Sequence, residues 1–86
     1  MAEYRVEIKR PAVRELEDLQ PSLARRILAS IEALASQPRT RQSRKLAGSE
    51  NSYRLRVGQY RVLYQIDDND RTVTVFAIGH RREVYR

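Results

Sequence analysis

The sequence predicts an α+β fold, in which an N-terminal strand and an αα-hairpin precede an antiparallel meander of three strands, with the helices packed on one face of the sheet. Three observations predict it. Apolar and charged residues alternate between residues 4 and 9, apolar residues recur at helical spacing between residues 13 and 34, and alternation returns between residues 53 and 79. With 86 residues and no long linker, the chain is expected to form a single domain over residues 1–86.

The first strand is predicted at EYRVEIK, where Tyr4, Val6 and Ile8 alternate with charged side chains. The helical pair follows it, with a corner at Pro21 and an end at Pro38. Proline suits the first turn of a helix, because the N–H that it lacks would have no partner there. The apolar residues that define the two helical faces are Val13, Leu16 and Leu19, and then Leu23, Ile27, Ile31 and Leu34.

Residues 39–52 are polar and rich in turn formers, so they predict a basic loop with a short strand around residues 44–46. An antiparallel meander is expected after this loop, because three alternating stretches follow one another with short turns between them. The expected strands are Tyr53–Val57, Tyr60–Asp67 and Arg71–Gly79, joined by turns at Gly58-Gln59 and Asp68-Asn69-Asp70.

The formal net charge of +6 is concentrated in one part of the sequence. Residues 1–38 and residues 62–86 each contain equal numbers of basic and acidic side chains, whereas residues 39–61 contain seven basic residues and one acidic residue. A charge run often forms only a solvated face. Six of these seven basic residues are arginine, however, whose planar guanidinium grips phosphate through two hydrogen bonds and stacks on bases. The middle segment therefore favours a polyanionic partner, nucleic acid above all.

The hairpin SYRLRVGQYRVLYQIDD carries three arginines on two adjoining strands. If Gly58-Gln59 is a two-residue turn, Arg54, Arg56 and Arg61 converge on one side of the sheet, and the apolar residues that alternate with them lie beneath the helices. Like charges that face each other across strands destabilise a sheet, so we expect a ligand to compensate. The expected pairs are Val57 with Tyr60, Arg56 with Arg61, Leu55 with Val62, Arg54 with Leu63, and Tyr53 with Tyr64.

The register of the last strand leaves two alternatives. A three-residue loop at residues 68–70 would place Ala77 opposite Arg61 and project Arg81 toward the arginines, whereas a four-residue loop would point His80 there. In both cases the last strand is expected to deliver the segment HRREVYR to the arginine face.

Composition excludes several kinds of site. The chain has no cysteine, one histidine and three widely spaced glycines, so it offers no thiolate metal site and no glycine-rich phosphate loop. We therefore expect no metal and no cofactor, and we interpret Asp67, Asp68 and Asp70 as a polar hairpin turn. RNA needs none of these groups, because its 2′-hydroxyl can attack the adjacent phosphate if the protein stabilises charge and moves protons.

The location of the protein is expected to be cytoplasmic. No apolar run approaches the roughly 18 residues of a membrane span, and the N-terminal MAEYRVEIKR lacks the apolar core of a signal peptide. The absence of cysteine fits a reducing compartment.

The segments RKLAGSENSYRLRVGQYRVLYQIDD and VTVFAIGHRREVYR together resemble the RelE/ParE toxin superfamily, and within it the RelE-type mRNA interferases. The order of strand, helical pair and strands is similar over essentially the whole chain. The resemblance implies the toxin of a toxin–antitoxin pair, a metal-independent endoribonuclease that cleaves mRNA in the ribosomal A site and so inhibits translation. It also implies a RelB-like antitoxin encoded in the same operon, in addition to ribosome and mRNA as partners.

Roles for individual residues follow from the resemblance. Arg61 and Arg81 would contact the scissile phosphate and the leaving group, while Tyr85 would stack on a base or assist proton transfer. Arg54 and Arg56 would stabilise charge and orient the RNA. Well-known RelE-type members have lysine at these two positions, and because arginine does not act as a base near neutral pH, any general-base role shifts toward Tyr85 or His80. The further RNA-binding residues that we expect are Arg44, Lys45, His80 and Arg82.

Other functions stay open at this point. A ParE-like inhibitor of DNA gyrase has the same architecture and catalyses nothing itself. A basic RNA-binding module, or a relative without activity, is a further alternative. The set of Arg61, Arg81 and Tyr85 favours the nuclease, because a gyrase inhibitor has no evident need for groups that act on a phosphate.

Overall fold

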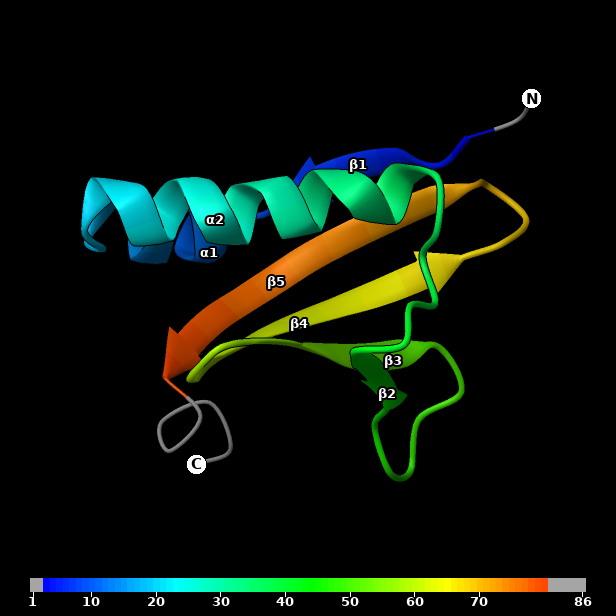
Figure 1. Cartoon of the computed structure of the whole chain (residues 1–86). Helices are drawn as coiled ribbons and strands as arrows, with labels where there is room; N and C mark the ends of the chain where they lie inside the picture. Colours follow the sequence, from blue (N-terminus) through cyan, green and yellow to red (C-terminus); the bar gives the residue numbers. More distant parts are fainter. Residues whose placement is uncertain (1–2, 81–86) are drawn as a thin grey trace.

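The structure is a computed structural model that describes residues 3–80. Its elements follow the predicted order, and the α+β prediction is confirmed (Figure 1). The strands of the meander lie within one residue of their predicted bounds, and both helices lie in the predicted segments, although α2 ends at Glu32 and only the 3-10 turn continues toward Pro38. The elements are β1 (Arg5–Ile8), α1 (Arg10–Glu17), α2 (Pro21–Glu32), the 3-10 turn η1 (Ala33–Ala35), β2 (Ser43–Lys45), β3 (Ser52–Val57), β4 (Tyr60–Asp67) and β5 (Thr72–His80).

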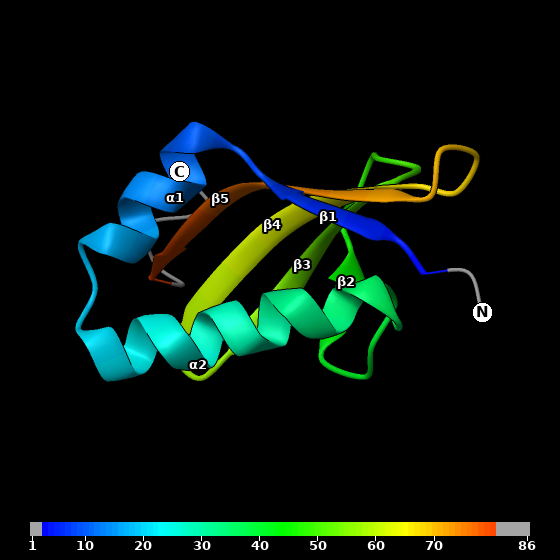
Figure 2. The same ribbon diagram turned by 90° about the horizontal axis from the view of Figure 1, so that it is seen from above.

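The strands form one mixed sheet in the order β1-β5-β4-β3-β2. The antiparallel meander of β3, β4 and β5 is confirmed, and β2 extends it antiparallel to β3. Strand β1 pairs parallel with β5 at the opposite edge. Both helices lie on the same side of the sheet (Figure 1), and the view from above shows β4 running between them (Figure 2). Within residues 3–80, no helix covers the other face of β3, β4 and β5.

Proline marks the first turn of each helix. Pro11 lies in the first turn of α1, and Pro21 is the first residue of α2. The residues before the helices, Lys9 and Gln20, make no side-chain capping hydrogen bond. The fixed φ of proline and its missing N–H therefore take the place of a polar cap.

The core lies between the helices and the sheet. Tyr64 is its largest fully buried side chain, and its hydroxyl donates a 2.6 Å hydrogen bond to the carbonyl of Pro38, so that no polar atom is left without a partner. Half-buried Tyr53 and Tyr60 pack against this core, as the alternation predicted. The buried cluster is formed by Ala12, Ile27, Ile31, Leu34, Leu55, Val57, Val62, Tyr64, Ile66, Val73, Val75 and Ile78.

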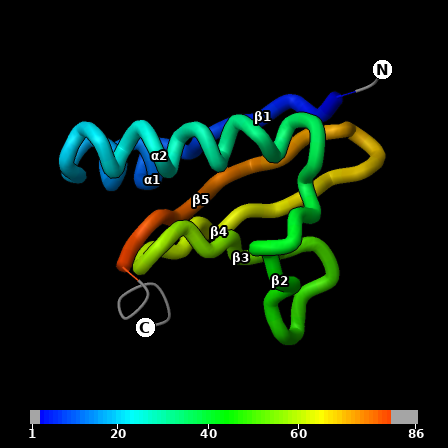
Figure 3. The backbone as a smooth tube through the Cα atoms, in the orientation of Figure 1, coloured from blue at the N-terminus to red at the C-terminus, as the bar shows by residue number. Residues whose placement is uncertain are grey.

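The turn between β3 and β4 has the predicted two residues. Gly58 has a φ of 60°, whereas Gln59 is not among the residues with positive φ, which is the pattern of a type II′ hairpin turn. All five predicted cross-strand pairs of this hairpin are confirmed. The backbone trace shows that the loop joining β2 and β3 extends away from the helices (Figure 3). Within residues 3–80, no helix has both the length and the apolar character needed to cross a membrane.

Candidate functional site

Four arginines form two facing pairs on the side of the sheet opposite the helices. Arg44 of β2 pairs with Arg54 of β3, and Arg56 of β3 pairs with Arg61 of β4. Leu55, between Arg54 and Arg56, is buried in the core, so the arginines on either side of it point to the other face. Facing like charges cost stability in a sheet. The fold therefore maintains an arrangement that packing alone would not favour.

These arginines line a hollow of about 300 Å³, which we call the arginine hollow. The backbone N–H of Arg56 donates a 3.1 Å hydrogen bond to the carbonyl of Gln42, which holds the segment before β2 against β3. None of the described residues that line the hollow is acidic. They are Arg41, Gln42, Arg44, Arg54, Arg56 and Arg61.

Four of the five arginines that line the arginine hollow form no ion pair with a carboxylate among the described residues. Arg44 and Arg61 each donate a 3.3 Å hydrogen bond to the carbonyl of the preceding residue, which orients the guanidinium without cancelling its charge. Within residues 3–80, no carboxylate forms an ion pair with Arg41, Arg44, Arg56 or Arg61. The hollow is therefore suited to bind an anion from outside the chain.

The chemistry that such a hollow supports is charge stabilisation. Guanidinium groups donate paired hydrogen bonds to phosphate oxygens, and when they are held in place they stabilise charge that develops on a phosphate during transfer. They do not accept protons near neutral pH. Any proton transfer must therefore involve the RNA itself or a residue outside the arginine hollow.

The structure brings together four of the predicted site residues: Arg44, Arg54, Arg56 and Arg61 line the arginine hollow. Lys45 does not line the hollow, because it pairs with Tyr53, which packs against the core on the helix side of the sheet. Strand β5 ends beside β4, next to the hollow. Three more predicted residues follow that end in the sequence, lie outside the described residues and keep their roles as predictions: Arg81, Arg82 and Tyr85.

The expectation that His80 points toward the arginines is wrong. His80 pairs with Tyr60, and their rings meet edge to face with centroids 5.6 Å apart. Tyr60 packs against the core on the helix side of the sheet. His80 therefore lies with Tyr60, and its role in binding RNA stays a prediction that its position does not favour.

The physical reason is a bulge in β5. Asp67 pairs with Thr72, so the loop has four residues and the three-residue alternative is wrong. The ladder then shifts by one residue between Tyr64 and Leu63, which leaves Phe76 as the extra residue of β5. As a result Ala77 pairs with Leu63, and Gly79 stands opposite Arg61. Gly79 therefore brings no side chain of its own to the position opposite Arg61.

Two lining residues were not among the predicted site residues. Arg41 belongs to the basic segment, but extending the short strand toward the N-terminus would place it opposite Val57, so the strand pattern does not predict that it lines the hollow. Gln42 carries no charge, but extending the short strand by one residue would place it opposite Arg56, and its carbonyl does accept a hydrogen bond from the Arg56 N–H.

A second group of polar side chains lies at the other end of β4, where the chain turns into β5. Asp68 accepts hydrogen bonds from Arg39, at 2.8 Å, and from the Tyr4 hydroxyl, at 2.5 Å. Arg39 also donates to the hydroxyl of Tyr53, at 3.0 Å, and lies over its ring. We call Tyr4, Arg39, Tyr53 and Asp68 the Asp68 cluster. It links the residue before β1, the segment after α2, strand β3 and the β4–β5 turn.

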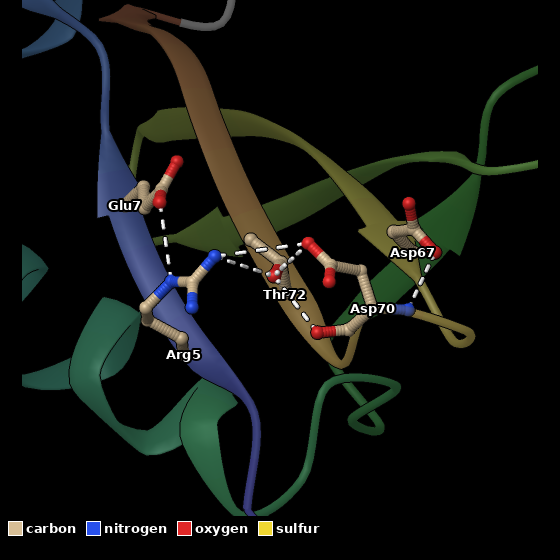
Figure 4. A network of polar contacts seen from close by, with 5 residues as sticks. All are labelled: Arg5, Glu7, Asp67, Asp70 and Thr72. Atoms are coloured by element: carbon tan, nitrogen blue, oxygen red, sulfur yellow. Dashed lines mark hydrogen bonds and ion pairs between the residues drawn. The ribbon is translucent and has the colours of Figure 1, made fainter.

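The remaining acidic residues of this turn are also engaged within the fold (Figure 4). The side chain of Asp67 accepts a hydrogen bond from the backbone N–H of Asp70, at 2.9 Å. Asp70 in turn accepts from the Thr72 hydroxyl and forms an ion pair with Arg5. In the described part of the chain no three acidic or histidine side chains form a group that could hold a metal ion. The side chains of Asp67 and Asp70 therefore hold the turn and its contact with β1 in place.

The pKa values of the Asp68 cluster agree with this role. The Arg39 guanidinium, and then the Tyr4 hydroxyl, lower the pKa of the Asp68 carboxyl below its ordinary value. The hydrogen bond to Asp68 raises the pKa of Tyr4. Burial raises the pKa of Tyr64. Each of these groups is held in the protonation state that it has near neutral pH, so none is prepared for proton transfer.

Comparison with known proteins decides the class of protein. Residues 6–85 match the family of the ParE toxin of the type II toxin–antitoxin system parDE. The chain belongs to the RelE/ParE toxin family. Toxin RelG of Mycobacterium tuberculosis is 35% identical over 91 residues, which cover 96% of this chain and 97% of the relative.

Solved structures place the chain on the RelE side of the RelE/ParE toxin family. The archaeal RelE–RelB complex from Pyrococcus horikoshii OT3 contains a chain that is 30% identical, with a TM-score of 0.83 over 98% of this chain and 100% of that one. The toxin–antitoxin complex RelBE2 of Mycobacterium tuberculosis gives a TM-score of 0.81 at 30% identity, over 92% and 99%. The protein is thus a RelE-like toxin of a type II toxin–antitoxin system, and the resemblance inferred from its sequence is confirmed.

Proposed function

We propose that this RelE-like toxin is a ribosome-dependent endoribonuclease that cleaves mRNA in the ribosomal A site, in the cytoplasm, without a metal ion. The observation that carries the proposal is the arginine hollow. Five arginines line it, and none of its described lining residues is acidic. An anion-binding surface of this kind fits a single phosphate that is attacked in place, with the adjoining nucleotides held against the sheet.

The proposed reaction uses the nucleophile of the RNA. The 2′-oxygen forms a bond to the adjacent phosphorus while the bond from phosphorus to the 5′-oxygen of the next nucleotide breaks. The products are a 2′,3′-cyclic phosphate and a 5′-hydroxyl. Arg61, with Arg54 and Arg56, stabilises the extra negative charge on the phosphate oxygens in the transition state, and Arg81 acts on the leaving group.

Two protons move in this reaction: one leaves the 2′-hydroxyl, and one joins the departing 5′-oxygen. Tyr85 is the proposed proton-transfer group, on the family resemblance alone. His80 is the weaker candidate, because it lies beside Tyr60 and not in the arginine hollow. The ribosome contributes by holding the mRNA in the bent geometry that lines up the 2′-oxygen with the bond to be broken.

The proposed partner is a RelB-like antitoxin encoded beside this gene. The complexes of the similar RelE proteins with RelB support it. An antitoxin segment that folds as it binds would cover the arginine hollow or the helical face and keep the toxin inactive. Co-expression of the neighbouring gene should restore growth and yield a stable complex.

A reconstituted translation assay tests the activity. Primer extension on the mRNA should show toxin-dependent cuts within ribosome-bound codons, and the cut 5′ fragments should end in a cyclic or 3′-phosphate. A 3′-hydroxyl end would contradict the mechanism. Because the matching family model is named for ParE, the same preparation is assayed for inhibition of gyrase supercoiling. Inhibition without mRNA cleavage would replace the proposal with gyrase as the target.

A further inference from the structure

A second hollow lies around the edge of β3, between α2 and the β3–β4 turn. Its volume is about 570 Å³, within the range of about 300–1,000 Å³ that small-molecule sites occupy. We call it the edge hollow. Its polar lining comes from Arg26 and Ser30 of α2, Thr40 and Gln42 before β2, and Arg56 of β3.

The edge hollow and the arginine hollow adjoin each other. Arg56 and Gln42 line both, and the hydrogen bond from the Arg56 N–H to the Gln42 carbonyl forms the boundary between them. A chain molecule with a phosphate in the arginine hollow can therefore continue over Arg56 into the edge hollow. No other hollow described for this chain shares a lining residue with the arginine hollow.

Arg26 gives the edge hollow a positive charge of its own. Its guanidinium lies against the hairpin turn, because a Cβ at Gly58 would come within 3.6 Å of its Nη1. Within residues 3–80 no carboxylate forms an ion pair with Arg26. Arg26 and Arg56 thus bring two guanidiniums to one hollow from different elements of the fold.

The lining is also partly apolar. Ala33, Leu55 and Val57 contribute to the same hollow. Guanidiniums beside an apolar surface match a nucleotide, whose phosphate is anionic and whose ribose and base have apolar faces. An acidic peptide would pair with the same guanidiniums, but its binding would not require the edge hollow to be continuous with the arginine hollow. We therefore propose that the edge hollow is a second RNA-binding subsite, which holds a nucleotide flanking the one in the arginine hollow, with Arg26 on its phosphate.

The inference rests on the proposed function, since it extends the path of the same RNA strand. Its test measures binding without cleavage, using 2′-O-methyl RNA, which cannot react. A dinucleotide, which has one internucleotide phosphate, is compared with a hexanucleotide, which can reach both hollows. Dissociation constants come from NMR titration of the isotope-labelled toxin at several salt concentrations.

The variants are Arg26→Ala and, as the matched control, Arg25→Ala. Both residues are exposed arginines of α2, but Arg25 lines neither hollow. Arg26→Ala should weaken hexanucleotide binding about 5- to 10-fold and reduce the salt slope by about 0.7, the value of one phosphate contact on a single strand. Dinucleotide binding, and both measurements for Arg25→Ala, should change less than about 2-fold. The Gly58 amide should shift with the hexanucleotide alone.

Several results would overturn the subsite. If Arg26→Ala and Arg25→Ala weakened hexanucleotide binding equally, Arg26 would contribute only to the overall positive charge. If the wild-type toxin did not bind the hexanucleotide, there would be no subsite. If Arg26→Ala weakened binding of the antitoxin while RNA binding stayed unchanged, the edge hollow would be a protein-docking surface. If the toxin did not cut mRNA but Arg26 still contributed to hexanucleotide binding, the proposed activity would fail and the subsite would stand.

Discussion

Strand β4 begins and ends beside arginines, and the two ends differ in what those arginines contact. At its start, Arg61 joins the arginine hollow, whose described lining residues include no carboxylate. Near its end, Arg39 forms a 2.8 Å ion pair with Asp68, the residue that follows the strand. The same residue type thus serves binding at one end and structure at the other. What distinguishes them is the partner that the fold supplies, which neither composition nor net charge reveals.

Tyr64 lies midway along β4, between the two regions, and its replacement should show the largest effect. Its ring is fully buried and stacks on Tyr53, with centroids 5.8 Å apart. Tyr64→Ala should lower the free energy of unfolding by at least about 3 kcal/mol, as large aromatic truncations do. Tyr64→Phe should lose only about 1 kcal/mol, because it removes the hydrogen bond to Pro38 and little else. Urea denaturation measures both values, and equal losses would show that the ring is not the main contribution.

Arg61→Ala tests the binding end of β4. The rate of mRNA cleavage should fall about 10²-fold or more, as when a preorganised charge-stabilising donor is removed. The free energy of unfolding should stay unchanged or rise by up to about 1 kcal/mol, since Arg56 loses a facing like charge. Single-turnover cleavage and thermal melts on the same protein measure the two quantities. Arg61→Lys, which keeps the charge but not the planar fork, should recover only part of the rate.

Asp68→Asn tests the structural end. The ion pair with Arg39 is partly exposed, with side-chain exposures of 46% and 57%, so its loss should lower the melting temperature only slightly. The cleavage rate should not change. Glu50→Gln is the matched control, because Glu50 is an exposed carboxylate with no ion pair within the described residues. If thermal melts showed the same small loss of stability for both variants, the contacts of Asp68 would contribute nothing to stability beyond the charge of one carboxylate.

The smallest expected effect is the change with pH in the contribution of Asp68 to stability. Because Arg39 and Tyr4 lower the pKa of Asp68 in the folded state, its contribution to stability is present above the ordinary carboxyl pKa of 3.8 and is lost as the pH falls through the lower, folded value. The difference in melting temperature between wild type and Asp68→Asn should therefore shrink as the pH is lowered from 7 toward that range. A constant difference would show that the carboxylate charge is not what stabilises the cluster.

The sequence predicted the fold and the hairpin well, because the signals for them are local. Gly58 fixes a two-residue turn, and strict alternation around it leaves a single register that keeps arginine out of the core. The arginine pair of Arg56 and Arg61 followed from these two facts alone. The position of β1 within the sheet could not be predicted in this way. Alternation identifies a strand but does not show which strand it pairs with, and β1 pairs with β5 from the far end of the chain.

The site was predicted less completely than the fold. The bulge at Phe76 adds one residue to β5 without any composition signal, and it alone moves His80 away from the arginines. Arg39 was counted with the basic segment, but its partner Asp68 lies 29 residues further along and could not be paired with it by spacing. The roles of Arg81, Arg82 and Tyr85 stay predictions, because these residues lie outside the described part of the chain.

The two ends of β4 can be compared directly by making the same change of residue at each. Arg61→Ala and Arg39→Ala each remove one guanidinium, and both are assayed for ribosome-dependent mRNA cleavage and for thermal stability in one set of preparations. We expect opposite outcomes: Arg61→Ala keeps its stability and loses cleavage about 10²-fold or more, whereas Arg39→Ala melts at a lower temperature and cleaves at the wild-type rate. If Arg61→Ala cleaves normally, or if it melts earlier than Arg39→Ala, the arginine hollow is not a site of phosphate chemistry.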